Sequence, residues 1–133
     1  MRGIVLADTG PLYAARDRDD THHNRAHDEL LRLQAENLKV VVPYPILLES
    51  YSLVLRKLGS GEAHALPAEV TRTAILTNAT TEDYRDASVT ILPYRDQDLT
   101  LFDTVLAAIS DRLEAPVWTF DHHFDVLRVG VWR

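Results

Sequence analysis

Short apolar segments that alternate with helical segments are the feature that most constrains the fold of this chain. Ile4–Ala7 and Lys39–Val42 are rich in branched aliphatic residues and too short for helices, which predicts strands buried within a sheet. Val117–Phe120 and about Val129–Trp132 are expected to form two further strands. Because helical segments separate these strands, we expect an α/β fold whose sheet is mainly parallel with helices on both faces.

The segments between the strands show helical periodicity and helix end signals. The strongest is Thr100–Glu114, where apolar residues fall on one face. Pro67 must start, kink or split the segment that contains it. Pro93 and the polar run Tyr94–Asp98 are expected to form a loop. The other predicted helices are a turn at Leu12–Arg16, then His22–Asn37, Pro45 to about Leu58, Glu62–Leu76, and a segment from Thr80 towards Leu92.

Length and composition indicate an ordinary globular chain. Its 133 residues, 46% hydrophobic and 26% charged, suit a single domain over residues 1–133. The absence of cysteine excludes disulfides, a thiolate nucleophile and zinc sites that need Cys ligands. The first apolar run stops at Asp8, and no apolar stretch approaches the roughly 18 residues of a membrane span. We therefore expect a cytoplasmic protein with no membrane partner.

Carboxylates stand directly after two of the predicted strands. Asp8 follows the first strand, and Asp121 follows the strand that ends at Phe120. In a parallel sheet both leave their strands at the same edge, where ligand sites gather. Two carboxylates placed in this way suggest a site for a hard divalent cation such as Mg²⁺. The alternative is that each aspartate only starts a turn or caps a helix.

Two further acidic residues begin helices near the same edge. Glu49 lies in the first turns of its helix, opposite the apolar stripe, a position that alone indicates a solvent-facing side chain. Asp103 and Thr100 have the spacing of a capping box, so capping and metal binding are alternatives for one carboxylate. The hydroxyls of Thr9 and Thr119 can orient carboxylates of the site, or they can be ordinary turn and strand hydroxyls.

These residues together resemble a known family. The chain is similar to PIN-domain ribonucleases, and especially to the VapC-type toxins of bacterial toxin–antitoxin pairs. The likeness covers nearly the whole chain, and its ordered set of acids is more specific than any single motif. It implies a three-layer α/β/α fold with a mainly parallel sheet of about five strands. The segments that carry it are Val5–Leu12, Pro45–Glu49, Phe102–Ala107 and Trp118–Phe124.

The resemblance also implies an activity. It implies an endoribonuclease dependent on one or two Mg²⁺ (or Mn²⁺) ions, an RNA substrate, a small antitoxin partner and a homodimer. One departure from the family pattern is the pair His122 and His123, where related chains often have Asp or Arg; Asp125 can supply an extra carboxylate instead. Metal-binding and catalytic roles carry over to Asp8, Glu49, Asp103 and Asp121, with Thr9 and Thr119 in support.

The net charge of the chain bears on whether its partner is a nucleic acid. A surplus of 20 acidic over 14 basic residues gives a net charge of −6, which by itself argues against a nucleic-acid partner. If four carboxylates converge on one edge and bind cations, 16 acidic residues remain against 14 basic ones. RNA binding should then depend on metal and weaken with salt.

The same residues are compatible with other interpretations. A catalytically silent PIN-like protein that only binds a partner would keep the same fold. Asp8-Thr9-Gly10 also spells the triplet of aspartic proteases, but those enzymes are all-β and this chain has several predicted helices. His23 and His27 have i,i+4 spacing without the glutamate of a metalloprotease motif, which favours a solvated helix start. His122 and His123 neighbour Asp121, so one of them can contact RNA or tune the site, but exposed turn residues are the favoured interpretation.

Overall fold

The structure is a computed structural model that describes residues 3–95 and 98–133, so part of the loop expected at 94–98 lies outside the described residues. None of its helices in these ranges is long and apolar enough to cross a membrane. The elements in chain order are β1 (Ile4–Ala7), α1 (Thr9–Arg16), α2 (His23–Ala35), β2 (Lys39–Pro43), α3 (Tyr44–Leu58), α4 (Ser60–Thr73), β3 (Ile75–Thr77), α5 (Thr81–Thr90), α6 (Leu101–Leu113), β4 (Val117–Trp118) and α7 (His123–Val126).

The strands form one parallel sheet in the order β3-β2-β1-β4. β1 is central: Leu6 pairs with Val41 of β2 and with Val117 of β4. The expected α/β fold with a mainly parallel sheet is confirmed. The described part of the chain contains a four-stranded sheet, where about five strands were expected.

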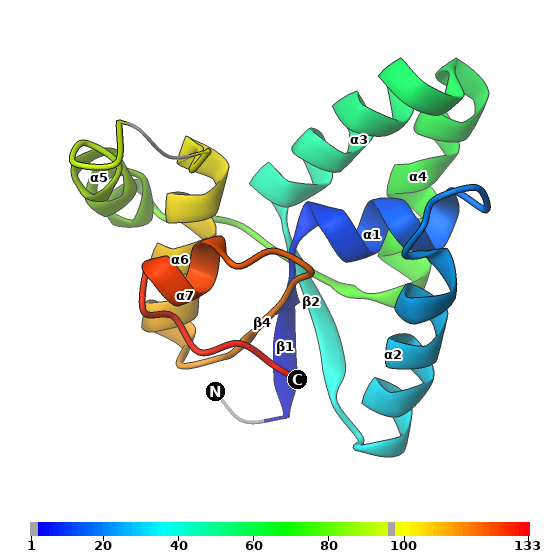
Figure 1. The fold of residues 1–133 in the computed structure, drawn as a ribbon, viewed down its shortest axis with the longest axis horizontal. Coiled ribbons are helices and arrows are strands. Elements are labelled where there is room, and N and C mark those ends of the chain that lie inside the picture. Colours follow the sequence, from blue (N-terminus) through cyan, green and yellow to red (C-terminus); the bar gives the residue numbers. More distant parts are fainter. Residues whose placement is uncertain (1–2, 96–97) are drawn as a thin grey trace.

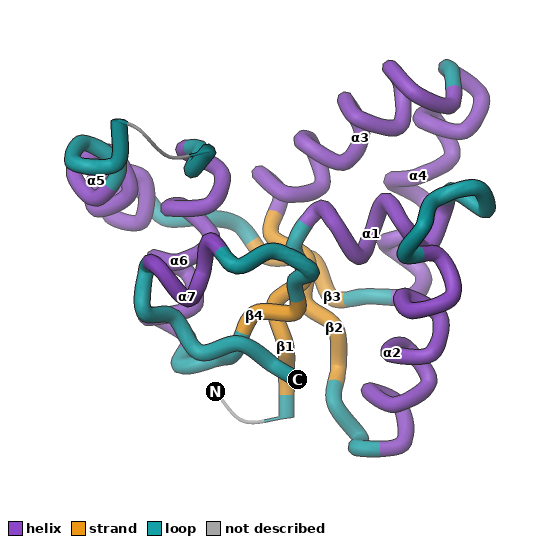
Figure 2. Tube along the Cα trace, in the orientation of Figure 1, coloured by secondary structure: helices purple, strands orange, loops and turns teal. Residues whose placement is uncertain are grey.

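Alternate residues of β1 point into two different cores, as the pleat of a strand requires. Ile4 and Leu6 join one buried cluster, and Val5 and Ala7 join the other. Figure 1 shows α5, α6 and α7 on one side of the sheet and α1 to α4 on the other, and the tube in Figure 2 shows the strands between them. The chain therefore has the three layers that the resemblance implied.

Two expectations about strands are corrected. Ile75 and Leu76 were expected at the end of a helix, but together with Thr77 they form the edge strand β3 beside β2. Pairing with β2 and packing of Leu76 against a buried cluster decide this, and neither depends on local periodicity. The strand expected over 129–132 is reduced to a single parallel bridge between Val131 and Val117, because β4 itself has only two residues.

The capping box predicted at Thr100 and Asp103 is present, and the structure has a second one at the start of α5. Thr100 and Asp103 cap α6, and Thr80 and Asp83 cap α5, each pair exchanging side chain-to-backbone hydrogen bonds. Asp83 also accepts hydrogen bonds from both Nε and Nη2 of Arg112 on α6. Burial acts to raise the pKa of Asp83, but the hydrogen bonds from Arg112 and Thr80 outweigh it and hold this pKa below its usual range. This buried carboxylate therefore ties α5 to α6.

We expect Asp83→Ala to lower the free energy of unfolding by about 2–3 kcal/mol, because it removes a helix cap and leaves Arg112 without its partner. Urea unfolding followed by circular dichroism measures the change. Asp86→Ala, at an exposed position of the same helix, is the matched control and should change stability by less than about 0.5 kcal/mol. Equal losses in the two variants would contradict the role of Asp83.

Candidate metal-binding active site

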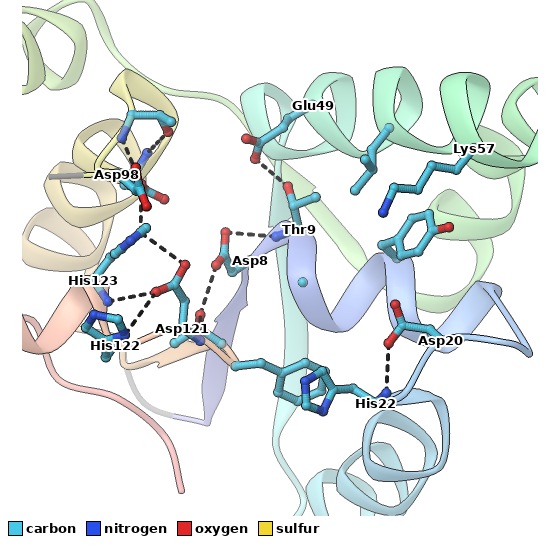
Figure 3. Close-up of a pocket in the computed structure, with 17 residues that line it drawn as sticks. Asp8, Thr9, Asp20, His22, Glu49, Lys57, Asp98, Asp121, His122 and His123 are labelled. Atoms are coloured by element: carbon cyan, nitrogen blue, oxygen red, sulfur yellow. Dashed lines mark hydrogen bonds and ion pairs between the residues drawn. The ribbon is translucent and has the colours of Figure 1, made fainter.

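A pocket of about 470 Å³ opens at the carboxyl ends of β1 and β4. The four acidic residues singled out from the sequence, Asp8, Glu49, Asp103 and Asp121, all line it. They come from four separate segments: the ends of β1 and β4, and the first turns of α3 and α6. Figure 3 shows several of these carboxylates facing the same space. The structure thus brings together residues up to 113 positions apart, as the parallel sheet predicted.

Asp8 is the most constrained of these carboxylates. It is buried, and its Oδ1 accepts a hydrogen bond from the backbone N–H of Thr9 at 2.8 Å while its Oδ2 accepts one from the hydroxyl of Thr119 at 2.9 Å. Burial raises the pKa of Asp8 to about 6; the hydrogen bonds act to lower it, and the negative charges of Asp103 and Asp121 act to raise it further. Asp8 caps α1 and faces the pocket at the same time.

Glu49 does not face solvent as its position opposite the apolar stripe indicated. Its side chain is half-buried in the pocket and accepts a hydrogen bond from the hydroxyl of Thr9. Burial raises the pKa of Glu49 to about 7, and the charges of Asp8 and Asp103 contribute in the same direction. The reason is tertiary: α1 and α6 pack beside α3 and cover the face that would otherwise be exposed.

Asp103 forms the helix cap that its sequence position suggested, and it also lines the pocket. Its Oδ2 accepts a hydrogen bond from the backbone N–H of Thr100 at 2.9 Å, which completes the capping box of α6. The same buried carboxylate lines the pocket. Its negative charge raises the pKa values of both Asp8 and Glu49. The helix cap therefore fixes the carboxylate at the site without removing it from the pocket.

Thr119 links two of the acids. Its hydroxyl donates to Asp8 and accepts a hydrogen bond from the backbone N–H of Asp121 at 3.0 Å. This turn ends β4 at Trp118, two residues earlier than expected, and directs the chain across the pocket. Asp125, the other predicted supporting residue, does not line the pocket; it forms an ion pair with Arg133 at 3.0 Å.

His123 belongs to the pocket, although its sequence position favoured an exposed turn residue. Its side chain is only 16% exposed, whereas that of His122 is 84% exposed. The Nδ1 atom of His123 lies 3.0 Å from Oδ2 of Asp121 and 3.3 Å from Oδ2 of Asp103. The only local signal is the next residue, Phe124, which is fully buried and holds this turn against the core. Lys57 and Asp98 also line the pocket, and sequence patterns did not single them out as site residues.

The donor set fits a hard divalent cation in its chemistry. Four carboxylates share one pocket, and the pKa values of Asp8 and Glu49 are raised by burial and by neighbouring negative charges, which a bound cation would offset. Nδ1 of His123 is buried without a hydrogen bond among the described residues. Within residues 3–95 and 98–133, no group of three or more His, Asp or Glu side chains is already arranged to hold a metal ion.

Comparisons with known proteins show the fold. No family model matches the chain, and no curated protein matches it. Among solved structures, the chain is similar to Mycobacterium tuberculosis VapC20, described as a sarcin–ricin loop cleaving toxin, with a TM-score of 0.83 at 20% identity over 97% of this chain and 98% of that one.

Two further structures agree. VapBC2 from Rickettsia felis, bound to a DNA fragment from their promoter, matches with a TM-score of 0.74 at 14% identity over 98% of this chain and 97% of that one. FitAcB from Neisseria gonorrhoeae matches with a TM-score of 0.66 at 16% identity over 97% of this chain and 96% of that one. The chain therefore has the fold of VapC-type toxins, and the PIN-like fold expected from its sequence is confirmed.

Proposed function

We propose that this chain is a metal-dependent endoribonuclease and the toxin of a toxin–antitoxin pair. The observation that carries the proposal is the convergence of Asp8, Glu49, Asp103 and Asp121 on one pocket, within a fold shared with a sarcin–ricin loop cleaving toxin. The reaction is hydrolysis of an RNA phosphodiester by water, which leaves 5′-phosphate and 3′-hydroxyl ends. We propose that residues 1–133 act as one domain, in the cytoplasm.

The four carboxylates would hold one or two Mg²⁺ or Mn²⁺ ions. When bound, these ions lower the pKa of a water molecule and offset the charge of the phosphodiester. Hydrogen bonds within the chain orient the carboxylates. The hydroxyl of Thr119 fixes Asp8 and the backbone of Asp121, and the hydroxyl of Thr9 fixes Glu49, so that these carboxylates are oriented before the substrate arrives.

The proposal includes protein partners. Two of the similar structures are named as two-component assemblies, VapBC2 and FitAcB, which supports a small antitoxin as a partner of this chain. A homodimer is the further expectation from the resemblance. A catalytically silent protein that binds the same partners is the alternative, since the fold alone is compatible with both.

The test is incubation of the purified chain with total RNA in Mg²⁺, in Mn²⁺ and in EDTA, with the new RNA ends mapped by sequencing. We expect cleavage at discrete sites with 5′-phosphate ends in either metal and none in EDTA. A silent binding protein would cleave in none of the three, even if the metals raised its melting temperature. Cleavage that persists unchanged in EDTA would rule out the proposed metal dependence.

A further inference from the structure

The pocket is strongly acidic, although its proposed substrate is an anion. Besides the four site carboxylates, Asp20 and Asp98 line it, which makes six. Among the described residues that line the pocket, Lys57 is the only Lys or Arg. Bound divalent ions would offset charge at the site carboxylates, but an RNA strand continues beyond the bond that is cut. A cation of the protein can offset the charge of the phosphates beyond that bond.

Lys57 lines the pocket from the same helix as Glu49. Glu49, Leu53 and Lys57 follow each other at i, i+4 and i+8 on α3, and all three line the pocket. Eight residues of helix separate Glu49 from Lys57 by about 12 Å along the axis. Figure 3 shows Asp121 and His123 at one end of the pocket and Lys57 at the other, with Asp8 and Glu49 between them.

The ammonium group of Lys57 is available for a ligand. Its Nζ lies 5.1 Å from the centre of the Tyr13 ring, and no described carboxylate lies within 4.0 Å of it as an ion pair. The hydrogen bond from the Tyr13 hydroxyl is the largest cause of the lowered pKa of Asp17, to which the charge of Lys57 contributes less, and Asp20 accepts a hydrogen bond from the backbone N–H of His22. Several arginines differ in this respect, because Arg16, Arg25, Arg32, Arg112 and Arg133 all form ion pairs.

We propose that Lys57 binds a backbone phosphate of the RNA at the end of the pocket away from Asp121 and His123, and so positions the strand along α3. This inference rests on the proposed nuclease function and adds one contact between the chain and its RNA substrate. An ammonium group is a compact charge with three donors, and it binds a phosphate without regard to the base. Lys57 therefore contributes to affinity and to the path of the strand, and it leaves base preference to other residues.

The test is the salt dependence of RNA binding. A short fluorescein-labelled single-stranded RNA is titrated with protein by fluorescence anisotropy, with Ca²⁺ in place of Mg²⁺ and the integrity of the RNA checked on a gel. Each phosphate contact to a single strand contributes about −0.7 to the slope of log affinity against log salt. We expect Lys57→Gln to make the slope shallower by about 0.7 and to weaken binding about fivefold at 0.1 M salt.

Two variants serve as controls. Lys57→Arg keeps the charge and should keep the slope. Lys39→Gln removes an exposed lysine at the start of β2, at the opposite edge of the sheet, and should leave the slope unchanged. If Lys57→Gln binds RNA with the slope of the unmodified chain, this inference is wrong while the nuclease proposal stands. If the unmodified chain neither binds nor cleaves RNA, the proposed function fails and the inference fails with it.

Discussion

Asp8→Asn is expected to reduce metal-dependent RNA cleavage by more than about 100-fold, because it removes a charged ligand from the centre of the proposed metal site. Asp8 is the carboxylate that contacts most of the site: it receives hydrogen bonds from Thr9 and Thr119, and the charges of Asp103 and Asp121 act on it. Asparagine has the same shape and can still accept one of these hydrogen bonds, so the variant should fold. The measurement is kcat/KM for a labelled RNA in Mg²⁺.

Asp125→Asn is the matched control for this experiment. It makes the same chemical change four residues after Asp121, but Asp125 pairs with Arg133 and does not line the pocket. We expect kcat/KM to stay within about twofold of the unmodified chain, as for a surface substitution. Retained cleavage in Asp8→Asn would show that the acidic pocket is not the active site, whatever the activity of the control.

The metal-free protein is expected to lose stability as the pH rises. The pKa of Asp8 is raised from 3.8 to about 6 in the folded state, so its contribution to stability is fully present below pH 4 and is lost as the pH rises through 6. Most of this change falls between pH 4.5 and 7.5, where it amounts to about 2 kcal/mol. The pKa of Glu49, raised to about 7, extends the loss in the same direction to neutral pH.

Urea unfolding in EDTA at several pH values measures this dependence. Other groups also titrate in the range, so the decisive comparison is with Asp8→Asn, which cannot ionise at this position. That variant should show a shallower decline, by about 2 kcal/mol between pH 4.5 and 7.5, and should be the more stable protein at the upper end. Parallel pH curves for the two proteins would contradict the raised pKa of Asp8. Such a result would mean that burial does not penalise this carboxylate.

Local signals predicted the elements that present three of the four acids. The apolar run Ile4–Ala7 ends at Asp8, the capping box begins α6 at Asp103, and a short strand precedes Asp121. These features depend on residues close in the chain, so periodicity and cap chemistry suffice to place them. The parallel order of the strands then put their carboxyl ends at one edge, where the structure has the pocket.

Other features had no local signal. Ile75–Thr77 forms an edge strand because it pairs with β2, although its sequence continues a helical segment. Glu49 enters the pocket because α1 and α6 cover its face of α3, and His123 does so because Phe124 is buried behind it. In each case the deciding contact comes from a residue or element that the local pattern does not contain.

By itself the sequence determined the class of fold and the edge of the sheet where the acidic residues gather, since strands that end in aspartate place these carboxylates at one edge of a parallel sheet. Only the tertiary structure decided that the face of α3 with Glu49 is covered, that His123 lines the pocket and Asp125 does not, and that Lys57 is the one lysine among the described residues that line it. The physical reason is that helix packing sets burial, and burial decides which charged side chains share a pocket and how strongly their pKa values shift.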